Sequence, residues 1–227
     1  AKLEQRLSKV IPDTFDLLLT PFLTLLVMSL LGLLAIGPVF HSLETVVLNA
    51  TEFVLNLPLG LAGIIIGFLN QLIVVTGVHH IFNFLEVQLL ANTGKNAFNA
   101  IVTCAIAAQG AACLAVGVKT KSAKLKALCF PSALSAFLGI TEPAIFGVNL
   151  RYVKPFVMGL IGGAAGGFVA NILGLAGTGM SITVIPGTLL YLNGQLFQYL
   201  LANLVAVGVA FALTYTIGYS DKMQENA

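Results

Sequence analysis

The chain has 227 residues, of which 58% are hydrophobic and only 9% are charged, and its formal net charge is +2. A soluble domain carries roughly a quarter charged residues, so this composition excludes a soluble enzyme and a disordered chain. The small basic excess excludes a nucleic-acid binder, which needs many cations to neutralise phosphates. We therefore expect an all-α protein that crosses a lipid bilayer several times.

The N-terminal segment 1–16 is polar and basic, with apolar residues at Leu3, Leu7, Val10 and Ile11. This spacing predicts an amphipathic helix that is cytoplasmic or lies in the membrane interface. The segment starts without a methionine and without the layout of a signal peptide. We expect the chain to be the C-terminal part of a longer membrane domain.

Residues 17–220 contain four long stretches without Asp, Glu, Lys or Arg. A helix needs about 20 apolar residues to cross a bilayer, so the first three stretches have room for one crossing each and the last for two. We therefore expect about five transmembrane helices, followed by a polar tail at 221–227. The expected spans lie near 18–40, 54–74, 98–118, 155–176 and 197–217.

Three further segments, 76–95, 127–150 and 177–195, are too apolar for aqueous loops, yet polar and helix-breaking residues interrupt them. Pro131 and Pro143, for example, cannot continue an undisturbed helix. Irregular backbone at membrane depth is tolerated only where protein buries it or where it lines a wet cavity. Transporters place substrate sites at such segments, so we expect two or three re-entrant or broken elements.

Four lysines between 119 and 126 predict that the loop after the third span lies in the cytoplasm. Three crossings before this loop would place the basic N-terminus on the outside. Two solutions remain open. Either 76–95 crosses the membrane at least in part, or the N-terminal helix lies on a membrane surface.

The cysteines and most glycines predict packing rather than chemistry. Cys104, Cys113 and Cys129 lie in apolar segments without CxxC spacing, so we expect buried thiols, with no disulfide framework, metal or cofactor. Glycines recur every four residues at Gly63 and Gly67 and again from Gly159 to Gly167. Small residues at this spacing let helices approach closely in a membrane.

The first group of residues that indicates a site follows Gly77. On a helix, five polar residues fall within an arc of about 120°, namely Thr76, His79, His80, Asn83 and Glu86. A polar stripe with an ionisable group on a membrane helix is by default a functional site. The alternative is an interfacial helix whose polar face meets lipid headgroups. A metal site is disfavoured because adjacent histidines do not share a coordination face.

The second group surrounds Glu142, the only acidic residue between Glu86 and Asp221. Apolar residues flank it, and Pro143 directly after it disfavours helical geometry at Glu142 and frees backbone groups. A glutamate at a helix break can accept hydrogen bonds from ligand hydroxyls. Two alternatives are an ion pair with Arg151 or Lys154 and a proton-coupling carboxylate.

The run GITEPAIFGVNLRYVKPF at 139–156 resembles the signature of the membrane-embedded IIC component of sugar phosphotransferase-system permeases, in the glucose–sucrose–β-glucoside superfamily. Three other runs fit the same family, and the resemblance covers the whole chain. They are GVHH at 77–80, AQGAACLAVG at 108–117 and PGTLLYLNG at 186–194. The run FLEVQLLA after the histidine pair is most similar to the sucrose branch, and trehalose and β-glucoside permeases are close.

The resemblance implies the substrate-carrying half of a IIC domain in a bacterial cell (inner) membrane, similar to an elevator-type transporter. It implies a homodimer formed through a scaffold half, which is the missing N-terminal half of IIC. The implied partners are the sugar and the IIB and IIA phosphocarrier domains. The assembly is then a protein-phosphohistidine–sugar phosphotransferase that imports and phosphorylates a disaccharide, sucrose first. The phosphorylated cysteine belongs to IIB, so no catalytic residue is expected in this chain.

The resemblance also implies roles for individual residues. Glu142 accepts hydrogen bonds from sugar hydroxyls, and one histidine of the pair holds the sugar near the hydroxyl to be phosphorylated. We favour His80 over His79 because it lies nearer to Asn83 on the polar stripe. Further expected sugar contacts are Thr141, Glu86 and Gln109.

Other functions remain open at this point. The chain could be a trehalose or β-glucoside permease of the same family. It could also be a cation- or proton-coupled secondary sugar transporter with Glu142 as the coupling carboxylate, although no second intramembrane acid lies near Glu142 in the sequence for a relay. A structural subunit without a substrate would leave the polar stripe and the broken segments unexplained.

Overall fold

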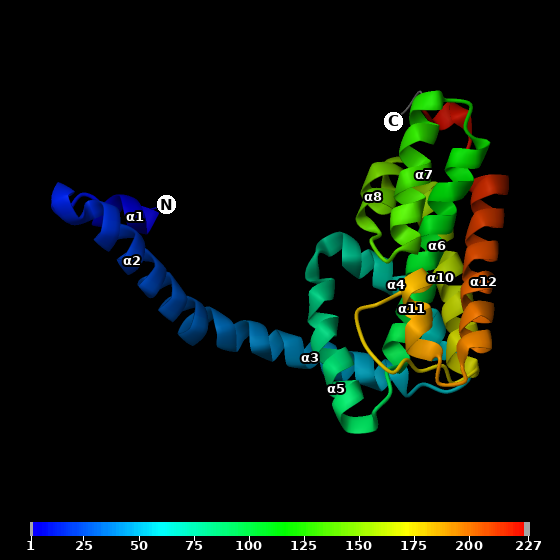
Figure 1. Ribbon diagram of the computed structural model, residues 1–227, viewed down its shortest axis with the longest axis horizontal. Helices are drawn as coiled ribbons and strands as arrows, with labels where there is room; N and C mark the ends of the chain where they lie inside the picture. Colours follow the sequence, from blue (N-terminus) through cyan, green and yellow to red (C-terminus); the bar gives the residue numbers. More distant parts are fainter. Residues whose placement is uncertain (1, 225–227) are drawn as a thin grey trace. The chain divides into compact units, whose positions relative to one another are not determined.

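The computed structural model describes residues 2–224, and this part of the chain is helical almost throughout (Figure 1). It contains no β-strand, and one antiparallel bridge joins Asn96 to Gly177. Four described helices are long and apolar enough to cross a membrane, or five if the bent pair Leu61–Thr76 and Val78–Thr93 forms one span. The predicted all-α membrane fold is confirmed. The chain divides into two compact units, Ala1–Ala50 and Thr51–Ala227.

The N-terminal unit begins with a short helix, α1 (Lys2–Leu7), and continues with α2 (Asp13–Leu31). The expected helix over 1–16 is therefore interrupted. Pro12 directly precedes α2 with φ −59° and ψ 142°, and a proline also disfavours helical geometry in the residue before it.

The helix then continues far beyond the expected end of the first span near residue 40. A π-helical turn, η1 (Gly32–Ile36), joins α2 to α3 (Gly37–Leu55). Pro38 has no N–H to donate to the preceding turn, and a π-turn is one way in which a helix accommodates such a break.

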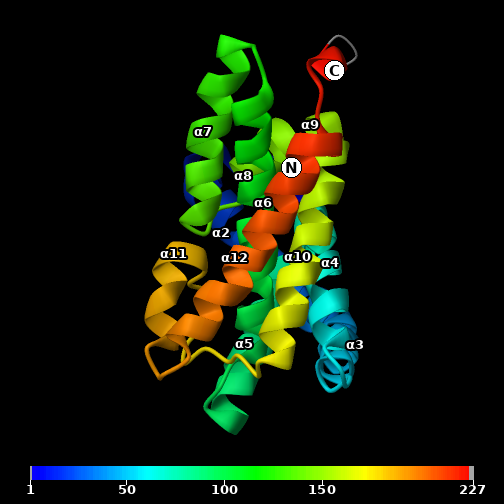
Figure 2. The same cartoon turned by 90° about the vertical axis from the view of Figure 1, so that its right-hand side faces the viewer.

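The second unit is a bundle of α4 (Leu61–Thr76), α6 (Ala97–Lys119), α10 (Lys154–Ile172) and α12 (Leu196–Leu213). Figure 2 shows α6, α12 and α10 side by side, with α4 beyond α10. The core between them is made of small residues, and the alanines of α6 and α12 are buried together with Tyr191 and Tyr199. The bundle gives the site a rigid support.

Glycines bring α4 and α10 into backbone contact. A Cβ atom on Gly63 would lie 2.0 Å from the carbonyl oxygen of Gly167, and one on Gly67 would lie 2.3 Å from that of Gly163. On the other face of α10, Gly162 packs on Ala210 of α12 at 2.6 Å by the same measure. Close backbone approach through small residues is how helices associate in lipid.

Three interrupted segments enter this bundle. The first bends by 118° after α4, where Gly77 adopts φ +79°, and continues as η2 (Val78–Ile81) and α5 (Phe82–Thr93). The start of α4 lies against Phe168 and Ile172 near the end of α10. The bridge Asn96–Gly177 places the end of α5 beside the segment that follows α10. Both ends of the bent pair therefore lie at the same end of the bundle.

The second segment is a helical hairpin. It descends as α7 (Ala123–Phe137), turns at 138–141, and returns through α8 (Glu142–Ala144), η3 (Ile145–Asn149) and α9 (Leu150–Tyr152). The third segment enters from the opposite end as an extended stretch and returns through α11 (Val184–Gly187) and η4 (Thr188–Tyr191). The two turns meet, because a Cβ atom on Gly139 would lie 3.0 Å from Oγ1 of Thr183.

Basic residues gather at the end of the bundle where α7 begins. Asp221, in η6 (Asp221–Gln224) after the π-turn η5 (Thr214–Gly218), accepts hydrogen bonds from the Thr120 hydroxyl at 2.9 Å and from the Lys121 N–H. The rings of Tyr152 and Tyr219 meet edge to face at the same end. Seven of the eight Lys and Arg residues between 51 and 224 belong to these segments, namely Lys119, Lys121, Lys124, Lys126, Arg151, Lys154 and Lys222. The eighth, Lys95, lies next to the Asn96–Gly177 bridge at the other end.

Candidate functional site

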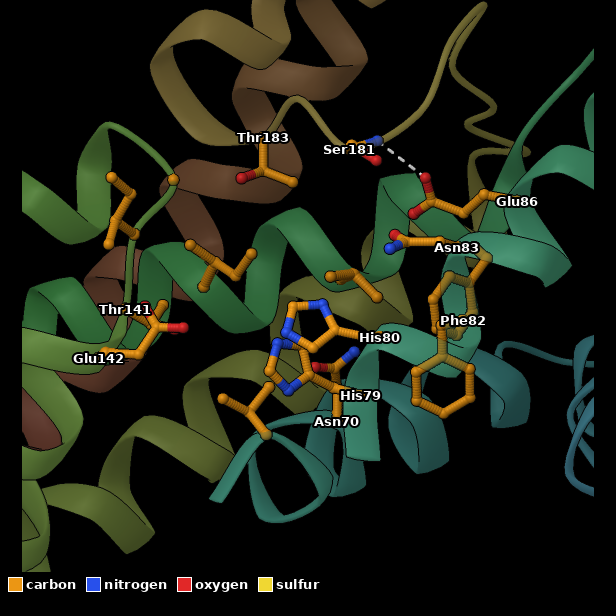
Figure 3. Close-up of a pocket in the computed structure, with 16 residues that line it drawn as sticks. Asn70, His79, His80, Phe82, Asn83, Glu86, Thr141, Glu142, Ser181 and Thr183 are labelled. Atoms are coloured by element: carbon orange, nitrogen blue, oxygen red, sulfur yellow. Dashed lines mark hydrogen bonds between the residues drawn. The ribbon is translucent and has the colours of Figure 1, made fainter. Parts of the chain in front are cut away.

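The three interrupted segments line a partly open cavity of about 400 Å³ within the second unit (Figure 3). This volume lies within the range of small-molecule sites, ~300–1,000 Å³. Polar residues from every interrupted segment line it, namely His79, His80, Asn83, Glu86, Thr141, Glu142, Ser181 and Thr183. Asn70 of α4 and an apolar face of α6 complete the wall.

The histidine pair lies where α4 ends. Gly77 stops α4 in a left-handed conformation, and the tight η2 turn then presents both imidazoles to the cavity. The two ring centroids are 4.2 Å apart. His80 is exposed to the cavity, whereas His79 is partly buried and its Nδ1 has no hydrogen-bond partner in the described part of the chain.

Glu142 reaches the cavity from the opposite side, at the turn of the α7–α8 hairpin. Gly139 has φ +102°, a conformation that favours glycine, and the turn is held by a hydrogen bond from the Ser135 hydroxyl to the Ile140 carbonyl. Pro143 is the second residue of α8, in the first turn, where a missing N–H costs nothing. Thr141 and Glu142 thus line the cavity, and Figure 3 shows the Thr141 side chain on the same level as the histidine pair across it.

The surroundings of Glu142 favour the binding interpretation over a structural ion pair with Arg151. The Arg151 guanidinium lies over the Tyr152 ring at the basic end, 5.9 Å from its centroid. Glu142 instead lines the cavity and is exposed to it. Its carboxylate is therefore accessible to a ligand.

The third wall is the extended stretch that leads to α11. The Ser181 N–H donates a hydrogen bond of 2.8 Å to Glu86 Oε2, which is drawn in Figure 3. Asn96 and Asn99 at the start of α6 donate to the carbonyls of Gly179 and Ile182. These bonds keep the stretch beside α5 and α6 and place Thr183 at the cavity.

The floor of the cavity is apolar. Val102 and Ile106 of α6 line it together with Phe82 and Phe98, whose rings are 4.8 Å apart. A site with an apolar floor and converging hydroxyl, amide, imidazole and carboxylate groups suits a ligand that has both C–H faces and many hydroxyls. Within residues 2–224 no group of three or more His, Cys, Asp or Glu is placed to hold a metal ion.

Five of the six residues expected at the site lie together at the cavity, namely His79, His80, Glu86, Thr141 and Glu142. The structure does not bring Gln109 there. Its fully buried amide donates to the Phe156 carbonyl at 3.2 Å and accepts from Asn149 at 2.8 Å. Gln109 therefore joins α6 to α10 and to η3.

Three polar lining residues were not expected from the sequence. Asn70 is a polar residue within an apolar span, 4% exposed, and that alone marks it as unusual in a membrane helix. Ser181 and Thr183 lie in an irregular glycine-rich stretch, where no periodicity shows which side chains face inward.

Comparisons with known proteins agree on one family, and they agree that this chain is shorter than the relatives it matches. The family model described as "Phosphotransferase system, EIIC" matches residues 1–163. The "PTS system sucrose-specific EIIBC component" of Salmonella typhimurium is 45% identical over 222 residues, which cover 95% of this chain and 48% of that protein. The protein of the same description from Bacillus subtilis (strain 168) is 42% identical over 228 residues, or 97% and 49% of the two chains.

A "PTS system trehalose-specific EIIBC component" of Bacillus subtilis (strain 168) is 31% identical over 216 residues, which cover 95% of this chain and 46% of that protein. The chain thus spans about half the length of the curated relatives it matches. No solved structure matches it.

Proposed function

Since the chain belongs to the phosphotransferase system EIIC family, we propose that it is the sugar-binding and sugar-translocating part of a IIC permease domain. Sucrose is the proposed substrate, because the two most similar relatives described above are named sucrose-specific. Trehalose is the second candidate, because a relative named for trehalose is 31% identical.

The cavity is the observation that carries this proposal. Two carboxylates, two imidazoles, two amides, two threonines and one serine line a space of about 400 Å³ above an apolar floor. Charge-assisted hydrogen bonds to hydroxyls are strong in a site that excludes water, and a site shaped for hydroxyls rejects analogues that lack them. These features suit a disaccharide.

In the proposed mechanism Glu142 accepts hydrogen bonds from sugar hydroxyls, and Thr141 adds a neutral partner beside it. His80, which is exposed to the cavity, holds the sugar near the hydroxyl that receives the phosphoryl group. The apolar floor at Val102 and Ile106 packs against the C–H face of a sugar ring. Gln109 has no part in this contact.

The phosphoryl group comes from outside this chain. Cys104, Cys113 and Cys129 are fully buried, so a phosphocarrier could not reach their thiols, and the phosphorylated cysteine is assigned to a IIB domain that receives its phosphoryl group from IIA. Phosphorylation adds about two negative charges at neutral pH. The sugar phosphate then cannot return through an apolar path, and uptake becomes directional.

We base the proposed assembly on the resemblance to this family, and the proposed orientation on the distribution of basic residues. The bundle over 51–224 is proposed to be the moving, sugar-carrying part of an elevator-type transporter in a bacterial inner membrane. A scaffold half from the N-terminal part of IIC, paired in a homodimer, would surround it. The basic end is assigned to the cytoplasm, where IIB approaches, because short loops rich in Lys and Arg remain on that side.

The test uses the full-length parent in membrane vesicles, supplied with labelled sucrose, phosphoenolpyruvate and the general phosphotransfer proteins. We expect sucrose phosphate to accumulate. Glu142→Gln should lower sucrose affinity about tenfold or more, because it replaces one acceptor oxygen with an NH2 group and removes the charge that strengthens the remaining hydrogen bond, and a hydrogen bond to a charged group is worth about 1.5–3 kcal/mol. Glu52→Gln, the same change outside the cavity, is the control.

Each outcome has a distinct meaning. Unchanged affinity in Glu142→Gln would refute the assignment of the site. Free sucrose that accumulates only with an ion gradient would refute the phosphotransferase function and favour a coupled transporter. Phosphorylated trehalose in place of sucrose would change only the substrate.

A further inference from the structure

Glu86 differs from the other polar residues of the cavity because its carboxylate already has a partner. It is 6% exposed, and Oε2 accepts the backbone N–H of Ser181 at 2.8 Å. The amides of Asn96 and Asn99 lie near the same carboxylate. A buried carboxylate is retained only when its oxygens are paired in this way, so Glu86 is bound to the protein itself.

The stretch that Glu86 holds is strained. Ser181 and Val184 have φ +63° and +51°, a region that side chains other than glycine rarely adopt, least of all a β-branched one. Such conformations persist only where surrounding contacts impose them. Beside Glu86, four side chains hold this stretch: Asn96 and Asn99 donate to the carbonyls of Gly179 and Ile182, the Thr103 hydroxyl accepts the Val184 N–H at 2.6 Å, and the Tyr199 hydroxyl donates to the Val184 carbonyl at 2.6 Å.

Thr183 lies between these two strained residues and touches the other hairpin. It is buried, and it lies against Gly139 at the turn that leads to Thr141 and Glu142. The position of Thr183 therefore sets the distance between the extended stretch and the turn that carries Glu142.

We propose that Glu86 is a positioning residue and not a sugar ligand: its bond to Ser181 fixes the 181–184 stretch, and through Thr183 it fixes the shape of the cavity. The carboxylate acts by placing an acceptor oxygen at the Ser181 N–H, so the length of the side chain matters more for the shape of the cavity than its charge. This inference deepens the proposed sugar site and rests on it for the affinity measurement, but not for the measurement of accessibility.

Three substitutions separate the two roles. Glu86→Gln keeps an acceptor oxygen at the same reach and removes the charge. Glu86→Asp keeps the charge and withdraws the oxygen by one methylene, and Glu86→Ala removes the acceptor. Gln88→Ala is the matched control, since Gln88 lies on the same helix, is exposed and does not line the cavity.

Accessibility is measured with Thr183→Cys in the full-length parent, as the rate of reaction with a small thiol reagent. In this background the cysteines outside this chain, including the proposed IIB cysteine, are replaced by serine, and the three cysteines of this chain are fully buried and react slowly. We expect Glu86→Ala and Glu86→Asp to raise the rate about tenfold or more, the factor of one lost hydrogen bond to a charged group. Glu86→Gln and Gln88→Ala should leave it within a factor of about three, because the bond to the acceptor oxygen remains.

Sucrose affinity is measured without the reporter cysteine. It should fall in Glu86→Ala and Glu86→Asp and be largely retained in Glu86→Gln and Gln88→Ala. If Glu86 were a sugar ligand through its charge, Asp would retain more affinity than Gln, and the thiol rates would not change. Equal thiol rates in all variants would overturn the inference even if sucrose still binds. If neither the parent nor any variant binds sucrose, the proposed function is refuted. The rates of thiol reaction still decide the role of Glu86 in that case.

Discussion

At the scale of single residues, the adjacent histidines have different surroundings. Both line the cavity, but His80 is exposed, whereas His79 is partly buried. Their rings contact each other at 4.2 Å, so each limits the rotation of the other. His80 therefore remains the proposed sugar contact, and we propose that His79 supports its position.

His80→Ala should reduce sugar phosphorylation about tenfold, the effect of one lost hydrogen bond, while the amount of protein in the membrane stays unchanged. His79→Ala is the comparison, and it should lower the amount of folded protein more than His80→Ala does. Vectorial phosphorylation normalised to the amount of protein distinguishes the two variants. A larger loss of normalised activity in His79→Ala would reverse the assignment.

The residues that sequence alone could predict are those whose type is costly at membrane depth. Glu142 and the histidine pair stand out because ionisable groups are rare in membrane spans. Thr183 could not be predicted, since a threonine is unremarkable in any segment and its place depends on where two distant turns meet. The resemblance implied a sugar contact for Gln109, but its side chain instead bonds to Phe156 and Asn149 of neighbouring segments.

At the scale of elements, proline and glycine predicted which segments are broken but not where each helix ends. The span near 18–40 was limited by the thickness of a bilayer, yet α3 continues to Leu55 because no further helix breaker follows Pro38 before that point. The opposite occurs at the N-terminus, where Pro12 separates two helices within one amphipathic pattern. Hydropathy indicates which segments are apolar enough to cross a membrane, whereas proline and glycine residues determine where each helix begins and ends.

Gly63→Ala tests the packing of α4 on α10. The added methyl would lie 2.0 Å from the carbonyl oxygen of Gly167, so the two helices must separate, and overpacking of this kind costs about 1–3 kcal/mol or more. We expect a lower thermal unfolding temperature in detergent. Gly208→Ala on α12 is the control, because nothing lies within 4 Å of its added methyl and helix propensity favours alanine by about 1 kcal/mol. Equal unfolding temperatures for Gly63→Ala and Gly208→Ala would contradict this packing argument.

At the scale of the whole molecule, the number of crossings could not be read from hydropathy. The bent pair α4 and α5 contains enough apolar residues for a span, but both of its ends lie at the end of the bundle opposite the basic loops. A segment that enters the membrane and returns to the same side adds no crossing, although it is as apolar as a segment that crosses. The path of the N-terminal helix relative to the membrane stays a prediction.

The orientation can be tested with two introduced cysteines in intact cells. Lys121→Cys lies at the basic end and Lys95→Cys at the opposite end, and both positions are exposed. If the basic end is cytoplasmic, a membrane-impermeant thiol reagent added outside should label Lys95→Cys and not Lys121→Cys. Opening the cells should make Lys121→Cys reactive. Labelling of Lys121→Cys from outside would invert the topology.

The glycine contacts between α4 and α10 have a consequence for how tolerance to substitution is interpreted. Gly63, Gly67, Gly163 and Gly167 have no room for even one methyl group, so selection should preserve them as strictly as any residue that contacts the transported molecule. A set of invariant positions would therefore contain both residues preserved for helix packing and residues preserved for contact with the transported molecule. The amount of protein separates them, since substitutions at the glycines deplete the membrane of protein, whereas substitutions at the cavity leave the protein present but inactive.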